Sequence, residues 1–161
     1  MSVIRVVIEI NAPPATCFDL ARSVDAHLES ASATGERAVG GVTHGLLNLG
    51  DEVTWRAKHF GVTQELTSRI VAFNRPYHFR DEMTRGVFRR LVHDHFFETV
   101  DHGTRMVDVF DFTAPLGFLG AVAEWLFLAA YMRRFLEQRA RILKQLAESN
   151  GGRSGSQGDR L

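Results

Sequence analysis

This sequence has few cysteines and prolines, and neither positive nor negative charge is in excess. The 161 residues include one cysteine and four prolines, and 19 lysines and arginines are matched by 19 aspartates and glutamates. A single cysteine excludes an intramolecular disulfide framework and is typical of a reducing compartment. Cys17 lies among apolar residues at helical spacing, so we expect a buried structural thiol. The balanced charge lacks the basic stripe of nucleic-acid-binding proteins, and we expect no nucleic-acid partner.

Long hydrophobic runs are also missing. The most apolar stretch, residues 118–132, contains Glu124 and is shorter than the roughly 20 residues that cross a bilayer. Residues 1–10 read as a strand and carry neither a positively charged leader nor a small-residue cleavage site. We therefore expect a cytoplasmic protein without a membrane span. A chain of this length is expected to form one domain with a real core.

Hydrophobic periodicity predicts the order of the elements. Residues 3–10 are rich in β-branched side chains and predict a first strand, and a short strand is expected at 36–42. Helical spacing predicts two short helices over 14–30 and one long helix over 117–148. Alternation over 51–113 predicts five long strands. We expect one domain, 1–148, and a disordered tail, 149–161. The solvated side of the long helix is expected to carry Arg133, Arg134, Arg139 and Arg141.

The alternation also predicts which side chains face the interior. Two-residue turns at 60–61 and 74–75 give an inner face that consists of Val53, Trp55, Ala57, His59, Val62, Gln64, Leu66, Ser68, Ile70, Ala72, Tyr77, Phe79, Asp81 and Met83. This register sets Asp81 opposite Ser68 and, depending on the loop at Gly86, beside His93 or Leu91. A last turn at 101–103 sets His95 opposite Phe110, with Asp108 diagonal to His95. It groups on one face His93, His95, Phe97, Asp108, Phe110 and Phe112.

Aspartates and histidines on an inner face need an explanation, because burying an unpaired carboxylate costs several kcal/mol. One interpretation is a paired polar network that braces a curved sheet. The other is a cavity in which these groups bind the polar atoms of a small molecule, or move protons near neutral pH. The residues alone leave both open.

The order of one strand, two short helices, antiparallel strands and a long final helix resembles the helix-grip fold. This is an α+β fold in which a curved antiparallel sheet wraps around the C-terminal helix. Residues 3–147 resemble the START and birch-pollen-allergen-like superfamily, also named SRPBCC, and a bacterial polyketide cyclase/dehydrase-like subgroup of it. The segments that carry the likeness, at 52–61, 79–83, 93–96 and 115–120, read EVTWRAKHFG, FRDEM, HDHF and PLGFLG. Some members of that subgroup are fused to an epimerase-like domain and are labelled "cell division inhibitor".

The resemblance and the polar inner face together predict a binding protein for an apolar or amphipathic small molecule. The candidate ligand-binding residues are Trp55, His59, Ser68, Phe79, Asp81, Met83, His93, His95, Phe97, Asp108, Phe110 and Trp125. The alternative is a cofactor-free cyclase, dehydratase or isomerase in which His93 or His95 moves a proton and Asp81 orients it. A third hypothesis, by analogy with the fused members, is a module that regulates an epimerase-like partner. The pattern predicts no oligomeric state.

Two further features bear on the site. His93 and His95 meet the minimum for two metal ligands on one strand face, with His59 or Asp81 as a third. Histidines so placed more often brace a fold or contact a ligand, and we expect no metal and no cofactor. The glycine-rich segment 36–50 is expected to form a mobile lip over the mouth of the cavity.

Overall fold

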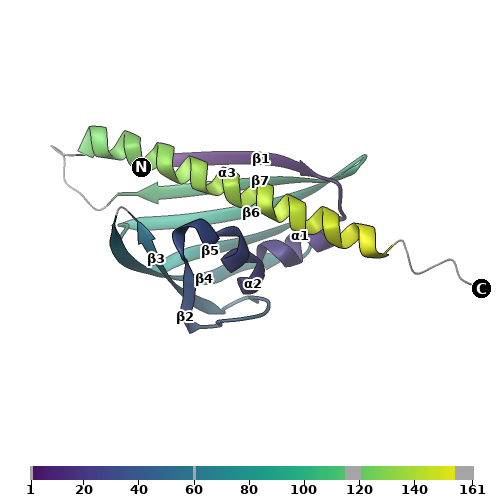
Figure 1. Ribbon diagram of the computed structural model, residues 1–161, viewed down its shortest axis with the longest axis horizontal. Helices are drawn as coiled ribbons and strands as arrows, with labels where there is room; N and C mark the ends of the chain where they lie inside the picture. The colour runs from purple at the N-terminus through teal and green to yellow at the C-terminus, as the bar shows by residue number, and fades with distance from the viewer. Residues whose placement is uncertain (1, 60, 115–120, 155–161) are drawn as a thin grey trace, which may run out of the picture.

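In the residues that the computed structural model describes, 2–59, 61–114 and 121–154, a seven-stranded antiparallel sheet packs against three α-helices (Figure 1). Side chains are described except at 33, 121–126 and 150–154. In chain order, the elements are β1 (Ser2–Ile10), α1 (Pro14–Ala21), α2 (Val24–Ser30), the 3-10 turn η1 (Ser32–Thr34), β2 (Arg37–Gly41), β3 (Glu52–His59), β4 (Val62–Asn74), β5 (His78–Arg85), β6 (Arg90–Val100), β7 (Gly103–Thr113) and α3 (Ala121–Ser154).

The strands follow the order β1-β7-β6-β5-β4-β3-β2, so β1 and β2 form the two edges. α3 runs across one face of the sheet and packs against β1, α1 and α2 (Figure 1). α1 also contacts β6 and β7. The predicted helix-grip fold is confirmed, including the two short helices after the first strand and the five long strands.

Local chemistry explains where the two short helices begin. Pro14 opens α1, where the missing N–H of a proline removes no helical hydrogen bond. Ser23 precedes α2, and its Oγ accepts a hydrogen bond of 3.2 Å from the Ala26 N–H. Cys17 is fully buried in α1, as predicted, and burial raises the pKa of its thiol.

Phe18 anchors the short helices on the sheet. Its buried ring meets those of Phe73, Phe79 and Phe97 edge-on, with centroids 5.2, 5.2 and 5.4 Å away. Edge-to-face pairs of this kind add to the roughly 1.5–3 kcal/mol gained by burying one large apolar side chain. These contacts attach α1 to β4, β5 and β6.

The hairpin between β4 and β5 differs from the prediction. Its turn spans residues 75–77, and a β-bulge interrupts the ladder between Ile70 and Ala72. Asp81 consequently pairs with Ile70 and not with Ser68. Tyr77 lies in the longer turn and is 56% exposed, so its predicted inward orientation is wrong.

The last hairpin is shifted by two residues from the prediction. Its turn consists of Asp101 and His102, one residue fewer than the predicted 101–103, and His95 pairs directly with Asp108. Because side chains alternate with a period of two, a shift of two leaves every residue on its predicted face. That face is the inner one, since its members are all buried: His93, His95, Phe97, Asp108, Phe110 and Phe112.

α3 extends further than predicted, to Ser154 instead of residue 148, so the expected tail begins inside the helix. The expected start at residue 117 falls outside the described residues. The inner stripe of the helix consists of Leu136, Ala140, Leu143 and Ala147, which are all buried. Within the described parts of the chain, no helix has the length and hydropathy needed to cross a bilayer.

Backbone hydrogen bonds hold the segment between β2 and β3. The Val24 N–H donates to the Gly45 carbonyl oxygen at 2.9 Å, and the Leu47 N–H donates to that of Arg22 at 3.0 Å. These bonds tie the segment to the junction of α1 and α2. Motion of this segment as a lip stays a prediction.

Candidate functional site

A cavity of about 130 Å³ lies between the middle of the sheet and α3. Most of its wall is apolar and consists of Trp55, Ala57, Leu66, Val87, Phe88, Leu91, Phe110, Leu128, Met132 and Phe135. Polar side chains interrupt this wall, among them His27, Glu36, His59, Ser68, Asp81, His93, Tyr131 and Arg139. A smaller cavity of about 60 Å³ shares part of this lining, including Trp55, Asp81, His93 and Arg139.

Nine of the twelve predicted ligand-binding residues line one of three neighbouring cavities. The larger cavity is lined by Trp55, His59, Ser68, Asp81, His93 and Phe110. The smaller cavity is also lined by Phe79 and His95. Asp108 lines a third, narrow space beneath α3. Phe97 packs against Phe18, and Met83 packs against the core; neither lines these cavities. The side chain of Trp125 lies outside the described part of the chain.

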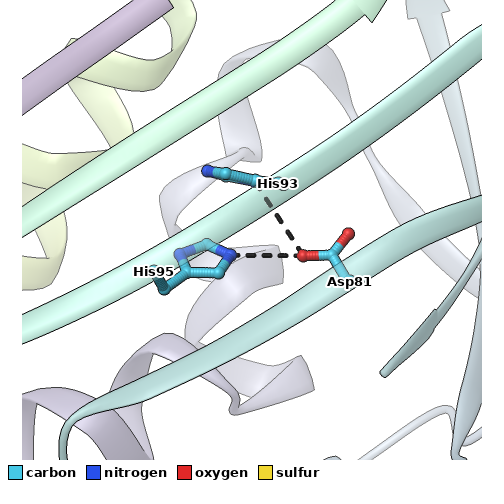
Figure 2. Close-up of side chains that lie close together, drawn as sticks. All are labelled: Asp81, His93 and His95. Atoms are coloured by element: carbon cyan, nitrogen blue, oxygen red, sulfur yellow. Dashed lines mark hydrogen bonds and ion pairs between the residues drawn. The ribbon is translucent and has the colours of Figure 1, made fainter. Parts of the chain in front are cut away.

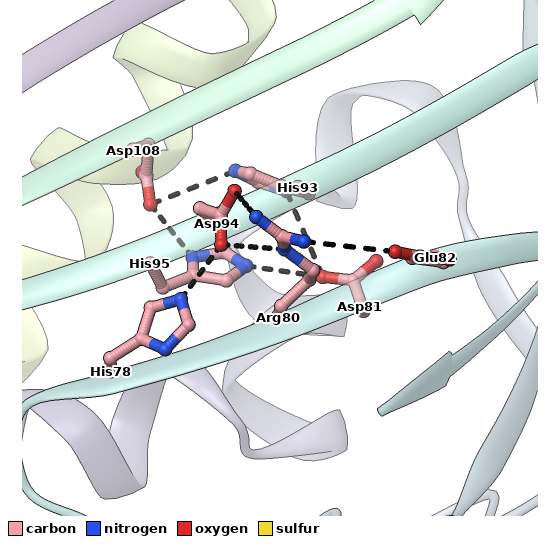
Figure 3. A network of polar contacts seen from close by, with 8 residues as sticks. All are labelled: His78, Arg80, Asp81, Glu82, His93, Asp94, His95 and Asp108. Atoms are coloured by element: carbon pink, nitrogen blue, oxygen red, sulfur yellow. Dashed lines mark hydrogen bonds and ion pairs between the residues drawn. The ribbon is translucent and has the colours of Figure 1, made fainter. Parts of the chain in front are cut away.

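His95 bridges two carboxylates, the buried Asp108 and the partly buried Asp81 (Figure 2; Figure 3). Its Nδ1 lies 2.7 Å from Asp108 Oδ1, and its Nε2 lies 3.2 Å from Asp81 Oδ1. His93 lies beside it, with Nε2 3.7 Å from Asp108 Oδ1 and Nδ1 4.0 Å from Asp81 Oδ1. We call these four residues the inner cluster. Asp81 pairs with His93, one of its two predicted neighbours, whereas Asp108 is directly opposite His95 and not diagonal to it.

Aromatic packing fixes the two imidazoles. The ring of Phe79 stacks on His95 with centroids 4.2 Å apart and planes inclined by 19°. His93 lies on the other side, 3.8 Å from His95, and meets Phe110 edge-on at 5.2 Å. Both rings are therefore held by aromatic contacts as well as by their polar neighbours.

The charges of the inner cluster follow from its geometry. Burial alone would lower the pKa of His95, but the charges and hydrogen bonds of Asp108 and Asp81 outweigh it and raise this pKa to about 9. Burial opposes ionisation of Asp108, yet His95 holds the pKa of that carboxyl far below its ordinary value. Burial and the charge of His95 both lower the pKa of His93, which is neutral at pH 7. One imidazolium thus stands between two carboxylates.

A second polar group lines the cavity on the side of the helices. We call it the helix-side group; it consists of His27 on α2, Glu36 before β2 and Arg139 on α3. His27 Nε2 lies 3.2 Å from Glu36 Oε2 without the alignment of a hydrogen bond. Burial, and then the charge of Arg139, lowers the pKa of His27 to about 4. Arg139 Nε is buried and has no hydrogen-bond partner among the described residues.

The helix-side group was missed by sequence reasoning. Arg139 was expected on the solvated side of the helix, which is wrong. It stands three residues after Leu136 and four before Leu143, both buried, so helical spacing puts it on the inner stripe. An arginine within an apolar stripe was the available signal. His27 and Glu36 lie in segments without a regular alternation, and only folding brings them together.

His59 stands apart from the inner cluster. Its Nδ1 lies 2.7 Å from the hydroxyl oxygen of Tyr131 on α3.

Asp81, His93 and His95 each offer one nitrogen or oxygen atom that could bind a metal ion, and these three atoms all lie within 4.8 Å of one another. The sequence offered His59 or Asp81 as the third metal ligand beside His93 and His95. Of these two, Asp81 lies next to both histidines.

The opposite face of β5 and β6 carries a separate ionic network (Figure 3). Asp94 Oδ1 lies 2.7 Å from His78 Nε2 and 2.8 Å from Arg80 Nε. Asp94 alternates with His93 and His95 along β6, so its side chain points away from the cavity. The same strands thus offer matched residues for testing the inner cluster.

Comparison with known proteins adds a family model and a set of solved structures. Residues 1–148 match the model described as "Polyketide cyclase / dehydrase and lipid transport". No curated protein matches the chain.

Three solved structures illustrate the shared fold. TTHA0849 from Thermus thermophilus is 17% identical, with a TM-score of 0.75 over 92% of this chain and 99% of that one. The Zhui aromatase/cyclase from Streptomyces sp. R1128 is 14% identical, with a TM-score of 0.76 over 96% and 98%. Ara h 8.0201 is 13% identical, with a TM-score of 0.54 over 88% and 97%. At these identities the likeness establishes the fold alone.

Proposed function

Because the chain belongs to the polyketide cyclase / dehydrase and lipid transport family of the SRPBCC superfamily, we propose that it binds a small, largely apolar molecule that carries a polar group. The observation that supports this most directly is the cavity of about 130 Å³ between the sheet and α3. Its wall is apolar over most of its extent and polar at the inner cluster and the helix-side group. Binding of this kind needs no cofactor.

The size and the apolar wall favour an organic ligand over water alone. One water molecule needs about 10–15 Å³ of such space, so the larger cavity accepts a molecule of several heavy atoms. A ligand that covers Trp55, Phe110 and Leu128 gains about 25 cal/mol for each Å² of apolar surface removed from water. These apolar contacts contribute affinity but do not select a particular shape of ligand.

The two polar groups supply orientation. Arg139 Nε and Glu36 Oε2 are buried without hydrogen-bond partners among the described residues, an arrangement that costs about 1–3 kcal/mol for each atom. A ligand hydroxyl or carbonyl that bonds to them would relieve this cost. The description of the family and the name of the Streptomyces relative both support a polyketide-like or lipid-like ligand.

Native mass spectrometry of gently purified protein tests this proposal, because a retained ligand adds its mass to the chain. Ala57 lines the cavity and is 7% exposed, so Ala57→Phe fills part of the space and should abolish the added mass. Val71→Phe is the matched control on an exposed position of β4, and should keep it. Saturable quenching of Trp55 fluorescence by an apolar dye is the second readout. If the folded wild-type protein showed neither a retained mass nor saturable dye binding, the proposal would fail.

A second candidate function is a cofactor-free cyclisation, dehydration or isomerisation. The favouring observation is the position of His95, whose two nitrogens contact two carboxylates while its ring lines the smaller cavity. Such a histidine can pass a proton to or from a ligand. The test is turnover of a polyketide-like thioester, lost in His95→Gln and kept in His78→Gln. Binding without any turnover would exclude this candidate and leave the first.

Two expectations from the sequence have no structural test. Regulation of an epimerase-like partner and a cytoplasmic location both stay predictions.

A further inference from the structure

We propose that Asp81, His93 and His95 form a binding site for a divalent transition-metal ion of the Zn²⁺ type, with Asp108 as the carboxylate that orients both imidazoles. This site lies beyond the proposed ligand binding, which needs no metal. It also reverses the expectation from the sequence, which was that no metal binds.

The three donor atoms already lie close to the positions that a metal requires. Asp81 Oδ1 is 3.2 Å from His95 Nε2 and 4.0 Å from His93 Nδ1. Metal bonds of about 2.0–2.1 Å in a tetrahedral site place neighbouring ligand atoms roughly 3.3 Å apart. Asp81 and His95 already have this separation, and all three atoms lie within 4.8 Å of one another, so His93 is the residue that would have to move. Figure 2 shows Asp81 facing His93 and His95, with a dashed line from one of its oxygens to each ring.

Asp108 gives both imidazoles the orientation that ligation needs. It lies behind them, with Oδ1 2.7 Å from His95 Nδ1 and 3.7 Å from His93 Nε2 (Figure 3). Metal-binding histidines usually donate the N–H of the second nitrogen to such a carboxylate, which turns the first nitrogen toward the metal. His93 Nε2 is buried and has no hydrogen-bond partner among the described residues. A small movement that brings it to Asp108 would satisfy this atom.

The charge of the site favours a cation. Asp108 is buried and Asp81 is partly buried, and their two negative charges exceed the single positive charge of His95, whose proton a bound ion displaces. From the helix side, Arg139 and Glu36 line the larger cavity together with Asp81. These two carry opposite charges and largely offset one another. The net negative charge of the cluster is therefore what an entering ion meets.

The donor set indicates the class of metal. Two imidazole nitrogens and one carboxylate oxygen suit Zn²⁺, Fe²⁺ or Co²⁺, whereas Ca²⁺ and Mg²⁺ require oxygen ligands. The smaller cavity of about 60 Å³ is lined by all three residues. It leaves space for a fourth ligand, either water or a polar atom of a bound molecule. Three protein ligands with one open position are typical of catalytic zinc sites, whereas structural zinc sites have four protein ligands.

Metal binding to the untagged, dialysed full chain tests this proposal without any organic ligand. Titration with Zn²⁺ by calorimetry should give one ion per chain, and Co²⁺ should give the visible absorption of a four-coordinate site. His93→Ala should weaken Zn²⁺ binding at least 100-fold. Asp108→Asn keeps all three ligands and should weaken it about 10–100-fold. His78→Ala, on the opposite face of the sheet, should leave it unchanged.

Two results would overturn the site. One is the absence of stoichiometric Zn²⁺ and Co²⁺ binding in the folded wild-type chain. The other is binding that survives His93→Ala, since the ion would then sit elsewhere. Circular dichroism tests whether each variant is folded. If His93→Ala is unfolded, Zn²⁺ binding by His93→Gln and the Co²⁺ spectrum of the wild type test the site instead. A failed metal titration together with a retained organic ligand would remove this site and leave the proposed function standing.

Discussion

The imidazole of His27 lies flat against the indole of Trp55, with ring centroids 3.9 Å apart and planes inclined by 19°. His27 belongs to α2 and Trp55 to β3, so the stack joins a helix to the sheet at the wall of the larger cavity. His27 is neutral there, because burial and Arg139 lower its pKa to about 4. Protonation of His27 should therefore weaken the packing of α2 against β3 at the cavity wall.

We expect His27 to make the protein less stable in mild acid. Its pKa is 6.5 in the unfolded chain and about 4 in the folded one. Between these values the unfolded state binds more protons, so stability falls as the pH falls. From pH 7 to pH 5 this amounts to about 2 kcal/mol of unfolding free energy.

Urea unfolding of the wild type and of His27→Gln at both pH values measures this effect. The loss on acidification should be smaller in the variant by that amount. His95, whose pKa is raised, contributes stability that is lost as the pH rises from 6.5 to about 9. This opposite trend is present in both proteins and cancels in the comparison. The same pH dependence in both would contradict the prediction.

Asp108→Asn should destabilise the protein far more than Asp94→Asn. Asp108 is paired with His95, whose side chain is 7% exposed, so the substitution leaves a buried positive charge without its nearest counter-ion. We expect a loss of about 3–5 kcal/mol. Asp94 is paired with Arg80, whose side chain is 42% exposed and can be solvated, and roughly 1 kcal/mol is expected there. Guanidinium unfolding at pH 7 measures both, and equal losses would argue against a buried imidazolium.

Phe18→Ala should be among the most damaging substitutions in the core. It removes the ring that Phe73, Phe79 and Phe97 surround, and the expected loss is about 3–5 kcal/mol of unfolding free energy. Val3→Ala, at a position that is 57% exposed, should change stability by less than about 0.5 kcal/mol. Thermal unfolding followed by circular dichroism separates the two. A small loss at Phe18 would mean that the short helices do not depend on this contact.

Gly103→Ala and Gly61→Ala compare two glycines with positive φ angles. At Gly103 an added Cβ would lie 2.2 Å from the Ile10 carbonyl oxygen, whereas at Gly61 nothing lies within 4 Å. Gly61→Ala should cost only the backbone strain, about 1–2 kcal/mol. Gly103→Ala must also separate β1 from β7 and should cost at least twice as much. Urea unfolding measures both, and equal losses would contradict the close approach at Gly103.

Most side-chain faces of the strands could be predicted from the sequence, but the pairing partners could not. The exception lies beyond the β-bulge in β4, where Ala72 pairs with Arg80 and Phe73 pairs with Phe79, so that Phe73 faces inward and the prediction for Ala72 is wrong. Asp81, His93 and Asp108 lie on the inner face as expected, because alternation survives a register error of two residues. The partners depend on details that alternation does not encode. The β-bulge beside Ile70 has no sequence signature, and the final turn at 101–102 is set by the close approach of Gly103 to β1.

The helix-side group shows a different limit of sequence reasoning. The spacing of Arg139 relative to Leu136 and Leu143 puts it on the inner stripe, but its charge argued for the solvated side. A buried charge is predicted only when its partner is known. Here Glu36, the carboxylate that interacts electrostatically with Arg139, is more than half the chain away and lies outside any regular pattern.

The inner cluster and the helix-side group should arise at different times during folding. All four residues of the inner cluster come from β5, β6 and β7, which are consecutive and joined by short connections, so only small loops must close to assemble them. His27, Glu36 and Arg139 meet only once the two ends of the chain have come together. We therefore expect amide protons in β6 and β7 to gain protection early in refolding, and α3 to dock afterwards, so that the chain encloses its cavity in the last step.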